Sequence, residues 1–447
     1  MISKEKQKKE LDNSLSGNKY CFCKNYIESG GKCIICQGLS KSEDYRIINS
    51  EAAKKYSIVV TGTNGKTTVT NILGRTLSSV FGDEVAYAST TGIYKGINKI
   101  INIEHRASEH YVYLLNQKDN EIVVCEQPEA GIYKFGLPRD HNIGVITNIS
   151  DDHLDRYWIE SGIDDLYAIK SLVAKMAIEG CVTSVDYPWT RKLVHDFDRG
   201  NFFILFGFDK EWVNKYSEMG YQVITVENNE FFLISKSNRK SLGLISDYLI
   251  TLSGILKYNV ENIMAILAVL IKASKFSEQL PKLIQSLREI PPSFSVNPAR
   301  FNVLSCKDCL VVFDYAHNVD GYKLSLESLT RLKKLAKKES VVGLVSVAKD
   351  RNKETVKKIA EIIRENIDIP FVRSGEENKN TEYLSQLVKR EGNAANIWKG
   401  DYVKFIQENC GSDRIVYITI AGRGHISDLA DTIKKLNLKD INLDSLG

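Results

Sequence analysis

A short stretch with the sequence SIVVTGTNGKTTV, residues 57–69, constrains this chain more than any other. Its apolar first half predicts a buried β-strand, and the residues after it predict a helix with Ile72, Leu73 and Leu77 on one face. A strand that runs through a glycine-containing turn into a helix is typical of phosphate-binding loops, because backbone N–H groups and the helix N-terminus then face the anion. Val60 replaces the first glycine of the full pattern, but the strand–turn–helix context is kept.

The loop and the first helical turn supply the candidate nucleotide-binding residues. They are Gly62, Thr63, Asn64, Gly65, Lys66, Thr67 and Thr68. The glycines let the backbone approach anionic oxygens, the Lys66 ammonium can reach β- and γ-phosphates, and the Thr67 hydroxyl suits Mg²⁺. A tight turn without a ligand is the alternative, but packing alone does not require a Lys-Thr-Thr run after a glycine. We therefore expect ATP and Mg²⁺ at this loop.

The chain has 447 residues, which is too long for one hydrophobic core, so we expect two or three domains. A hydrophobic content of 43% and a charged content of 26% are ordinary for a soluble globular protein. The net charge of +4 gives no argument for a nucleic-acid partner or an anionic membrane. Residues 1–15 lack the apolar core of a signal peptide, and no apolar run is long enough to cross a membrane. We therefore expect a cytoplasmic protein without membrane insertion.

Four cysteines in residues 1–45 have the spacing of metal ligands. Cys21 and Cys23 are followed by Cys33 and Cys36, with two glycines between the pairs. Two thiolate pairs joined by a glycine turn can close a tetrahedral site, for which Zn²⁺ is the first choice. Because the protein would fill all four positions, such a site would be structural or would dock a partner protein. Free thiols are the alternative.

Two further apolar segments predict buried strands with polar residues at their ends. Residues 121–125 lead to Glu126, and residues 143–147 lead to Asn148 and then to His153. Ligands bind at the carboxyl ends of parallel strands in α/β sheets. Glu126 and His153 are therefore candidate Mg²⁺ ligands, or hydrogen-bond partners of such ligands. A capping or core role is the alternative for His153.

Several motifs, in order, resemble the ATP-dependent Mur ligase superfamily, which includes the peptidoglycan amino-acid ligases and folylpolyglutamate synthetase. They are TGTNGKTT at residues 61–68 and NISDDHL at residues 148–154. Within the superfamily, the chain is similar to the Mur-like part of cyanophycin synthetase. Residues 126–137 resemble its Glu-x-x-Arg-Gly-Gly-x-x-x-x-Gly-Leu pattern, although Glu129 and Ala130 replace Arg-Gly. This replacement reverses a charge beside the expected substrate site.

The resemblance implies roles for residues of the central region. Glu126 and His153 would help to hold metal ions. Lys170 matches a lysine that is carbamylated in many members, a change that turns a cation into an anionic oxygen ligand. Asn259 matches an adenine contact, whereas Tyr258 replaces the usual histidine. A solvated helix lysine is the alternative for Lys170.

A second domain is expected after the Pro-Pro pair at 291–292, because neither proline continues a helix. Residues 301–304 and 310–313 are apolar and predict the two strands of a hairpin. Cys306 and Cys309 lie between these segments, and we interpret them as turn residues. Half of a metal site is the alternative.

Residues 297–302 and 314–318 are again similar to cyanophycin synthetase. In the superfamily this domain closes over ATP. The resemblance implies that Arg300 reaches the phosphates, Asp314 the ribose and His317 the edge of the nucleotide. A guanidinium suits this role because it offsets charge during phosphoryl transfer. A turn-capping aspartate is the alternative for Asp314.

The remaining sequence alternates between strands and helices. Residues 341–347 and 415–420 predict strands and residues 353–366 predict a helix, which together favour a small doubly wound domain. Residues 349–351 and 422–425 follow two of these strands and resemble the Gly-Asp-Arg and Ala-Gly-Lys-Gly-His segments of Mur ligases. The resemblance implies that the incoming amine binds on this side.

The predicted fold class is α/β. A P-loop central domain with a mostly parallel sheet spans 46–295, a smaller Rossmann-like domain spans 296–447, and the four-cysteine zinc segment, 1–45, precedes them. Within the central domain, residues 190–245 are charged and predicted to be strand-rich, without assigned chemistry.

We expect an ATP- and Mg²⁺-dependent ligase that works through an acyl phosphate. It would join a carboxylate-bearing acceptor, such as a peptide or an amino-acid polymer, to an amine or amino acid. Its catalytic residues would be Lys66, Glu126, His153, Lys170 and Arg300. Two alternatives stay open: a MurT-like subunit that amidates a peptidoglycan precursor, and a nucleotide-gated binding module without catalysis.

Overall fold

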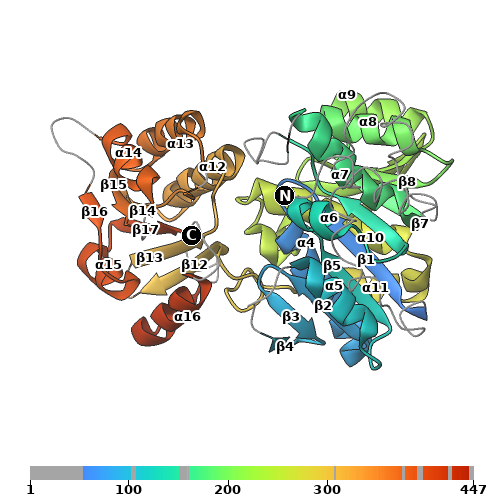
Figure 1. Cartoon of the computed structure of the whole chain (residues 1–447), viewed down its shortest axis with the longest axis horizontal. Helices are drawn as coiled ribbons and strands as arrows, with labels where there is room; N and C mark the ends of the chain where they lie inside the picture. The colour runs from blue at the N-terminus through green and yellow to red at the C-terminus, as the bar shows by residue number, and fades with distance from the viewer. Residues whose placement is uncertain are drawn as a thin grey trace, which may run out of the picture. The chain divides into compact units, whose positions relative to one another are not determined.

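The computed structural model describes residues 54–101, 107–150, 159, 161–306, 309–349, 351–374, 378–389, 396–420 and 425–441. The described chain forms two compact units (Figure 1). The first unit contains the chain up to Asp247 together with Glu261–Ile290, and the second contains Tyr248–Val260 and the chain from Pro291 on. Both units are α/β with mostly parallel sheets, so the predicted fold class is confirmed at this level. The predicted cysteine segment lies outside the described residues.

Eleven strands form one sheet in the first unit, in the order β11-β10-β9-β8-β7-β6-β1-β5-β2-β3-β4. Neighbours from β9 to β2 are parallel, and antiparallel pairs extend both edges. The strands are β1 (Tyr56–Thr61), β2 (Val85–Ser89), β3 (Gly92–Lys95), β4 (Asn98–Ile101), β5 (Ile122–Glu126), β6 (His141–Ile146), β7 (Ala177–Ser184), β8 (Phe203–Phe206), β9 (Gln222–Glu227), β10 (Glu230–Ser235) and β11 (Asn238–Leu244). Because β1 lies between β5 and β6, the ends of both strands flank the loop after β1.

Helices cover both faces of this sheet (Figure 1). Val59 of β1 packs in one core with residues of α5 to α9, whereas Gly74 of α4 lies against Tyr87 on the other face. A Cβ at Gly74 would lie 2.3 Å from the Tyr87 ring, so glycine permits this close packing. The helices are α4 (Lys66–Phe81), α5 (Ala107–Asn116), α6 (Glu129–Phe135), α7 (Ile163–Lys175), α8 (Pro188–Phe197), α9 (Lys210–Glu218), α10 (Lys257–Lys272, in this unit from Glu261 on) and α11 (Leu280–Arg288), with 3₁₀ helices η3 (Gly82–Glu84), η4 (Ile245–Asp247) and η6 (Ser274–Gln279).

The expectation for residues 190–245 is only partly right. Strands β8 to β11 lie there, but α8 and α9 separate and precede them. Both helices are polar on most of their surface and bury only a few side chains, such as Leu193 and Val213. Their narrow apolar stripe explains why the sequence did not predict them, since helical periodicity is read from such stripes.

The second unit holds a seven-stranded sheet in the order β16-β15-β14-β17-β13-β12-β18. Strands β16 to β13 are parallel, and β12 and β18 add antiparallel pairs. The strands are β12 (Arg300–Cys306), β13 (Cys309–Asp314), β14 (Ser340–Val345), β15 (Ile369–Arg373), β16 (Asn396–Trp398), β17 (Arg414–Thr419) and β18 (Lys439–Asp440). The predicted hairpin of β12 and β13 is confirmed, with Cys306 and Cys309 as its last paired residues.

Helices also cover both faces of the second sheet. Helices α12 to α14 pack on one face and α15 and α16 on the other (Figure 1). Helix α13 shows how the sequence specifies such an element: the Asn352 side chain accepts the Thr355 N–H at its start, and Val356, Ala360 and Ile363 are buried at helical spacing. The helices are α12 (Val319–Leu335), α13 (Lys353–Asn366), α14 (Lys379–Leu387), α15 (Tyr402–Asn409) and α16 (His425–Leu436), with the 3₁₀ helix η5 (Leu249–Thr251).

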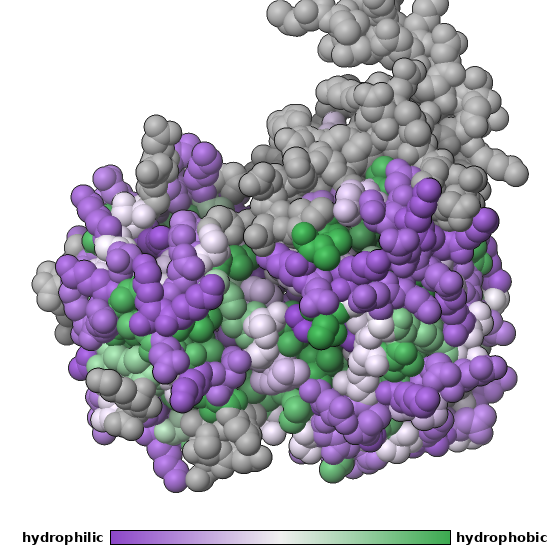
Figure 2. Space-filling model, turned by 90° about the horizontal axis from the view of Figure 1, so that it is seen from below, coloured by the Kyte–Doolittle hydropathy of each residue, from purple (hydrophilic) through white to green (hydrophobic). Residues whose placement is uncertain are grey.

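On the face drawn in Figure 2, hydrophilic residues predominate and hydrophobic residues form small groups among them. Large apolar side chains such as Ile178 and Met219 are exposed singly, which is common. Within the described part of the chain, no helix combines the length and apolarity needed to cross a bilayer.

Candidate functional site

The turn between β1 and α4 requires glycine at two positions. Gly62 has φ of 147° and Gly65 has φ of 86°, and both values lie where other residues are strained. A Cβ would also lie 1.9 Å from Thr147 Oγ1 at Gly62 and 2.5 Å from Asn262 Oδ1 at Gly65. The chain therefore turns sharply, and α4 begins at Lys66 directly after it.

Asn148, at the end of β6, holds the shape of this turn. Its Oδ1 accepts the N–H groups of Thr63 at 3.1 Å and Asn64 at 2.8 Å, and its backbone carbonyl accepts the Thr63 N–H at 3.0 Å. Thr147 adds a hydrogen bond from its hydroxyl to the Asn64 carbonyl at 2.6 Å. The sequence predicted Asn148 at a strand end but not this role, since only the β1–β6 pairing brings it to the loop.

Lys66 folds back over the loop. Its Nζ donates to the carbonyl oxygens of Gly62 and Thr63, both at 2.7 Å. Two neutral acceptors are a weaker environment for an ammonium than phosphate oxygens, with which it would form charge-assisted hydrogen bonds. The lysine is therefore placed where the sequence predicts a phosphate-binding group.

Oxygen atoms from three elements meet beside the first turn of α4. Glu126 Oε2 accepts from the Thr67 hydroxyl at 3.0 Å and from the Thr90 N–H at 2.7 Å. The Thr67 and Thr90 hydroxyl oxygens lie 2.8 Å apart. Glu126 is 1% exposed, and hydroxyl and carboxylate oxygens are the ligands that Mg²⁺ prefers. The structure thus brings Thr67 and Glu126 together and adds Thr90, which the sequence analysis missed.

A buried lysine lies next to the same loop. Lys170 of α7 is 1% exposed, and its Nζ donates to Thr63 Oγ1 at 2.9 Å. The Thr63 hydroxyl in turn contacts the backbone of Ser150. The alternative of a solvated helix lysine is therefore wrong, because the side chain is buried. Burial of an ammonium costs free energy unless partners compensate, and the Thr63 hydroxyl is one such partner.

Several predicted residues lie outside the described part of the chain. They are Cys21, Cys23, Cys33, Cys36 and His153, together with Asp350 and residues 421–424. Among the described residues, no three His, Cys, Asp or Glu side chains are arranged to hold a metal ion. The oxygen cluster at Thr67 is of another kind, since it combines one carboxylate with two hydroxyls.

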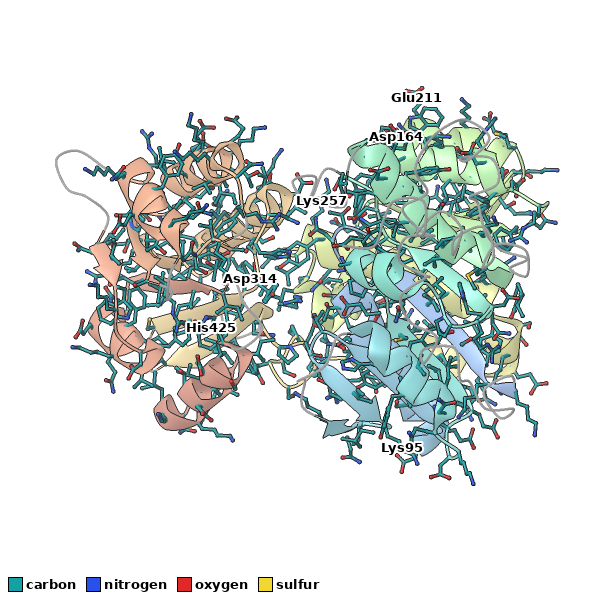
Figure 3. The ribbon with its side chains drawn as sticks, in the orientation of Figure 1. Lys95, Asp164, Glu211, Lys257, Asp314 and His425 are labelled. Carbon is teal, nitrogen blue, oxygen red and sulfur yellow. The ribbon has the colours of Figure 1, made fainter. Side chains whose placement is uncertain are left out.

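In the second unit, the structure brings Arg300 and Asp314 together across the β12–β13 hairpin, where they are paired residues. The Arg300 guanidinium carbon lies 4.5 Å from the centre of the Tyr315 ring. Asp314 Oδ1 accepts the Phe301 N–H at 3.1 Å. Burial raises the pKa of Asp314, while hydrogen bonds and the Arg300 charge oppose the increase. Figure 3 marks Asp314 in the second unit.

Other predicted nucleotide contacts lie near this pair. The Tyr258 phenol is buried close enough to Asp314 for burial and the carboxylate charge to raise the pKa of Tyr258 well above its ordinary value. Its neighbour Asn259 donates from Nδ2 to the Ile250 carbonyl at 2.8 Å. His317 Nδ1 lies 2.9 Å from the Tyr315 carbonyl. The nucleotide roles of these residues remain predictions.

Charged and aromatic side chains also gather at the carboxyl ends of β15 and β17. The Arg373 guanidinium carbon lies 3.8 Å from the centre of the Tyr402 ring, and burial lowers the pKa of Arg373. His425, which Figure 3 labels, lies at the start of α16. Its Nδ1 lies 3.1 Å from Asp428 Oδ2, and its ring meets the Tyr402 ring edge to face. Arg351, after β14, is 6% exposed. The sequence analysis missed Arg373, because it predicted no strand at residues 369–373, where β15 forms.

Comparison with known families decides how the β1–α4 arrangement is classified. Residues 60–270 match the family described as Mur ligase middle domain. This part of the chain is therefore similar to the middle domain of Mur ligases. The match covers the phosphate loop, Glu126 and Lys170, and it confirms the resemblance that the sequence motifs predicted.

Similarity in sequence to curated relatives extends beyond this match. A cyanophycin synthetase from Geminocystis herdmanii is 23% identical over 328 residues, which are 73% of this chain and 36% of the relative. The chain therefore spans only about a third of that relative's length. A UDP-N-acetylmuramoyl-L-alanyl-D-glutamate--2,6-diaminopimelate ligase from Prochlorococcus marinus is 24% identical over an alignment of 477 positions, gaps included, and the alignment covers 96% of this chain and 88% of the relative.

Solved structures share the fold at low sequence identity. FolC from E. coli in complex with DHPP and ADP has a TM-score of 0.63 at 16% identity. The superposition covers 92% of this chain and 97% of the FolC chain. MurF ligase from Thermotoga maritima in complex with ADP has a TM-score of 0.55 at 19% identity. This superposition covers 88% of this chain and 81% of the MurF chain. These structures show that the fold of this protein is the fold of Mur ligases and FolC.

Proposed function

We propose that this protein is an ATP- and Mg²⁺-dependent ligase that forms an amide from a carboxylate and an amine. One observation carries the proposal: the Lys66 ammonium lies over a glycine loop, and oxygens of Thr67 and Glu126 meet at the first turn of the helix that follows it. This set suits a triphosphate with its metal ion. The relatives' names, a cyanophycin synthetase and a diaminopimelate ligase, support ligation, and two structural neighbours hold ADP.

The proposed reaction has two steps. A carboxylate oxygen of the acceptor attacks the γ-phosphorus of ATP, the bond to the β–γ bridging oxygen breaks, and ADP leaves. The amine nitrogen then attacks the acyl carbon of the acyl phosphate, loses a proton, and inorganic phosphate leaves as the amide forms. The protein supplies position and positive charge instead of a covalent intermediate. Lys66 would exchange the Gly62 and Thr63 carbonyls for phosphoryl oxygens.

Three residues fit Mg²⁺: Thr67, Thr90 and Glu126 supply hard oxygen donors on adjacent strand ends and the helix start. We propose His153 as a further ligand. When bound, Mg²⁺ would offset the charge of the phosphate groups. A carbamate on Lys170, which we also propose, would place an anionic oxygen next to Thr63, because the unmodified Nζ already reaches that hydroxyl.

We propose that Arg300, Asp314, His317 and Asn259 also bind the nucleotide. The pairing of Arg300 with Asp314 supports this, because a guanidinium and a carboxylate side by side can contact a phosphate and a ribose diol respectively. Burial of the Asp314 carboxylate raises its pKa and is costly for stability, which favours a ligand role for this side chain.

For the amine substrate we propose an amino acid that binds at the ends of β15 and β17. Arg373 offers a cation for a carboxylate group, and Asp428 offers an anion for an ammonium. The Tyr402 ring contacts both the Arg373 guanidinium and the His425 ring. Arg373 and Asp428 lie close enough to interact electrostatically. Together they offer one cation and one anion for the two charged groups of a free amino acid.

The proposed organisation has three parts: a zinc segment at 1–45, the ATP-binding domain at 46–295 and a Rossmann-like domain at 296–447. We propose a cytoplasmic location, because the reaction consumes ATP. If all four thiolates of the cysteine segment bind zinc, no position is left open for chemistry. Its proposed role is therefore structural or a contact with a partner protein.

The test is product formation that depends on Lys66. The full chain is incubated with ATP, Mg²⁺, a peptide pool and amino acids, while ADP release is measured and new amides are identified by mass spectrometry. We expect Lys66→Ala to lower the rate at least about 100-fold, as for loss of a group that stabilises transition-state charge. The control Lys210→Ala removes an exposed lysine of α9 and should not change the rate. ATP turnover that is equal in both variants would contradict the proposal.

A further inference from the structure

Three cysteines that are distant in sequence meet in the second unit. Cys306 ends β12 and Cys309 begins β13, directly opposite it, while Cys410 follows the last residue of α15. Cys410 Sγ lies 3.9 Å from the Cys306 carbonyl oxygen. Cys309 Sγ lies 3.5 Å from the Leu310 carbonyl oxygen. Cys309 and Cys410 lie close enough for each thiol to shift the pKa of the other. The sequence analysis identified only Cys306 and Cys309, which are close in sequence. Cys410 is about 100 residues further along the chain, and only the fold of the second unit brings it to them.

The three cysteines belong to the core between the sheet and helices α15 and α16. Cys309 is 2% exposed, whereas Cys306 and Cys410 are partly exposed at its margin. Cys309 starts β13 and Asp314 ends it, so the cluster lies at the opposite end of this strand from the proposed nucleotide contacts. A strand of this length separates the two by about 17 Å. The cluster is therefore independent of the proposed ligase site.

The thiol pair is polarised. The interaction with the Cys410 thiol lowers the pKa of Cys309 in spite of burial, and the Gly411 N–H and the Lys338 charge contribute in the same direction. The same interaction, followed by burial, raises the pKa of Cys410. Cys309 is thus the sulfur that more readily becomes a thiolate, and the thiolate is the form that reacts with oxidants.

We propose that Cys309 and Cys410 are an oxidation site that closes to a disulfide when the protein meets hydrogen peroxide or another small hydroperoxide. The Cys309 thiolate attacks one peroxide oxygen, the O–O bond breaks, and the released hydroxide takes a proton to form water, leaving a sulfenic acid. Cys410 then loses its proton, its sulfur attacks the Cys309 sulfur, and the S–O bond breaks to release a second water. The two electrons of the thiol pair reduce the peroxide.

The disulfide would link the β12–β13 hairpin to the connection between α15 and β17. It would enclose a loop of about 100 residues, and loops of that length give the largest restriction of the unfolded chain. We therefore expect oxidation to raise the melting temperature of the second unit by several degrees, roughly as other long-loop disulfides do. Because the pair lies at the other end of β13 from Asp314, nucleotide binding should be kept.

The test uses the full chain with stoichiometric hydrogen peroxide. Free thiols are then blocked with iodoacetamide, and the non-reduced digest is mapped by mass spectrometry. We expect a peptide that joins Cys309 to Cys410, and a melting temperature that rises on oxidation and returns on treatment with dithiothreitol. Recovery of Cys309 and Cys410 as separate alkylated peptides would overturn the proposal, as would a bridge that contains Cys306.

Variants provide matched controls for the wild-type map. Cys306→Ser removes the third thiol and should keep both the bridge and the thermal shift. Cys410→Ser should lose both, and the Cys309 sulfenic acid should then be trapped by dimedone. Failure to trap it in a Cys410→Ser protein that melts like the reduced wild type would contradict the assignment of Cys309 as the reacting sulfur.

Discussion

At the residue scale, alanine substitutions at Gly62 and Gly82 distinguish two effects on stability. One is the steric clash of an added Cβ, and the other is the strain of a positive φ in a residue other than glycine. Both glycines have positive φ, but a Cβ at Gly62 would lie 1.9 Å from Thr147 Oγ1 and 3.2 Å from the Asn148 backbone, whereas a Cβ at Gly82 meets nothing within 4 Å. We expect Gly82→Ala to lower the free energy of unfolding by about 1 kcal/mol and Gly62→Ala by about 3 kcal/mol, because the second change adds a clash.

Chemical denaturation measures both values. Nucleotide affinity gives a second readout, because Gly62 forms the phosphate loop and Gly82 lies at the far end of α4. We expect ADP binding to be lost in Gly62→Ala and kept in Gly82→Ala. Equal losses of stability and affinity in the two variants would show that the loop does not depend on its close contact with Thr147 and Asn148.

The substitution Asp314→Asn should raise the stability of the protein and weaken its binding of nucleotide. Since burial raises the pKa of Asp314, its carboxylate form is less stable in the folded protein than in the unfolded chain. The wild type therefore loses stability as pH rises through the folded pKa, and the neutral variant Asp314→Asn does not. We expect Asp314→Asn to melt higher than the wild type at pH 8 and the difference to vanish below about pH 4, where both are neutral.

Binding should change in the other direction. If Asp314 holds the ribose, Asp314→Asn should weaken ADP binding about tenfold, which corresponds to the loss of one charged hydrogen bond. Asp431→Asn, an exposed change on α16, is the control for both measurements. A variant that is more stable but binds ADP normally would remove Asp314 from the proposed nucleotide site.

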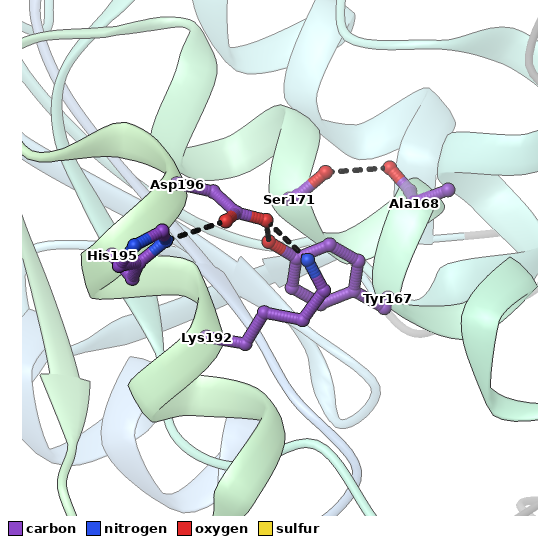
Figure 4. A network of polar contacts seen from close by, with 6 residues as sticks. All are labelled: Tyr167, Ala168, Ser171, Lys192, His195 and Asp196. Carbon is purple, nitrogen blue, oxygen red and sulfur yellow. Dashed lines mark hydrogen bonds and ion pairs between the residues drawn. The ribbon is translucent and has the colours of Figure 1, made fainter. Parts of the chain in front are cut away.

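At the scale of elements, a carboxylate joins α7 to α8 (Figure 4). Asp196 Oδ2 accepts from the Tyr167 hydroxyl and from Lys192 Nζ, both at 2.6 Å, and Oδ1 lies 3.1 Å from His195 Nδ1. Burial would raise the pKa of Asp196, but the hydrogen bonds from Lys192, Tyr167 and His195 outweigh it and lower the pKa to about 2. At pH values above the ordinary pKa of Asp, this contact stabilises the packing of α7 against α8.

The sign of the pH effect follows from that decrease. The stabilisation by Asp196 is fully present above about pH 4 and is lost as pH falls towards 2, since protonation then removes the charge. The stabilities of the wild type and Asp196→Asn in urea should therefore differ at pH 6, and the difference should become smaller as pH falls from about 4 towards 2. His195→Ala, which keeps the Tyr167 and Lys192 contacts, should change stability less. A difference that does not depend on pH would contradict the role of the charge.

Elements with strong local patterns were predictable from the sequence. The segment 353–366 has the predicted helix at the same residues, and the hairpin around Cys306 and Cys309 forms as expected. The grouping of Thr67, Thr90 and Glu126 was not fully predictable, because it depends on which strands become neighbours. Sheet order is set by packing over the whole domain, and local spacing does not record it.

At the scale of the whole molecule, the nine cysteines include two chemically different groups. Cys306, Cys309 and Cys410 meet in the second unit, and the described residues hold no cluster of His, Cys, Asp or Glu arranged for a metal ion. The paired cysteines near the N-terminus have the spacing of a tetrahedral thiolate site. Zinc bound to the full chain should therefore depend on the N-terminal cysteines and not on Cys306, Cys309 and Cys410.

We expect about one zinc per chain in protein purified without chelators, as for a single closed thiolate site. Cys33→Ser should lose the metal, because three thiolates and one alcohol bind zinc much more weakly than four thiolates, whereas Cys309→Ser should keep it. Elemental analysis of the three proteins decides between the groups. If the wild type holds no zinc, the N-terminal cysteines are free thiols, and if Cys309→Ser loses it, the metal belongs to the second unit and competes with the proposed disulfide.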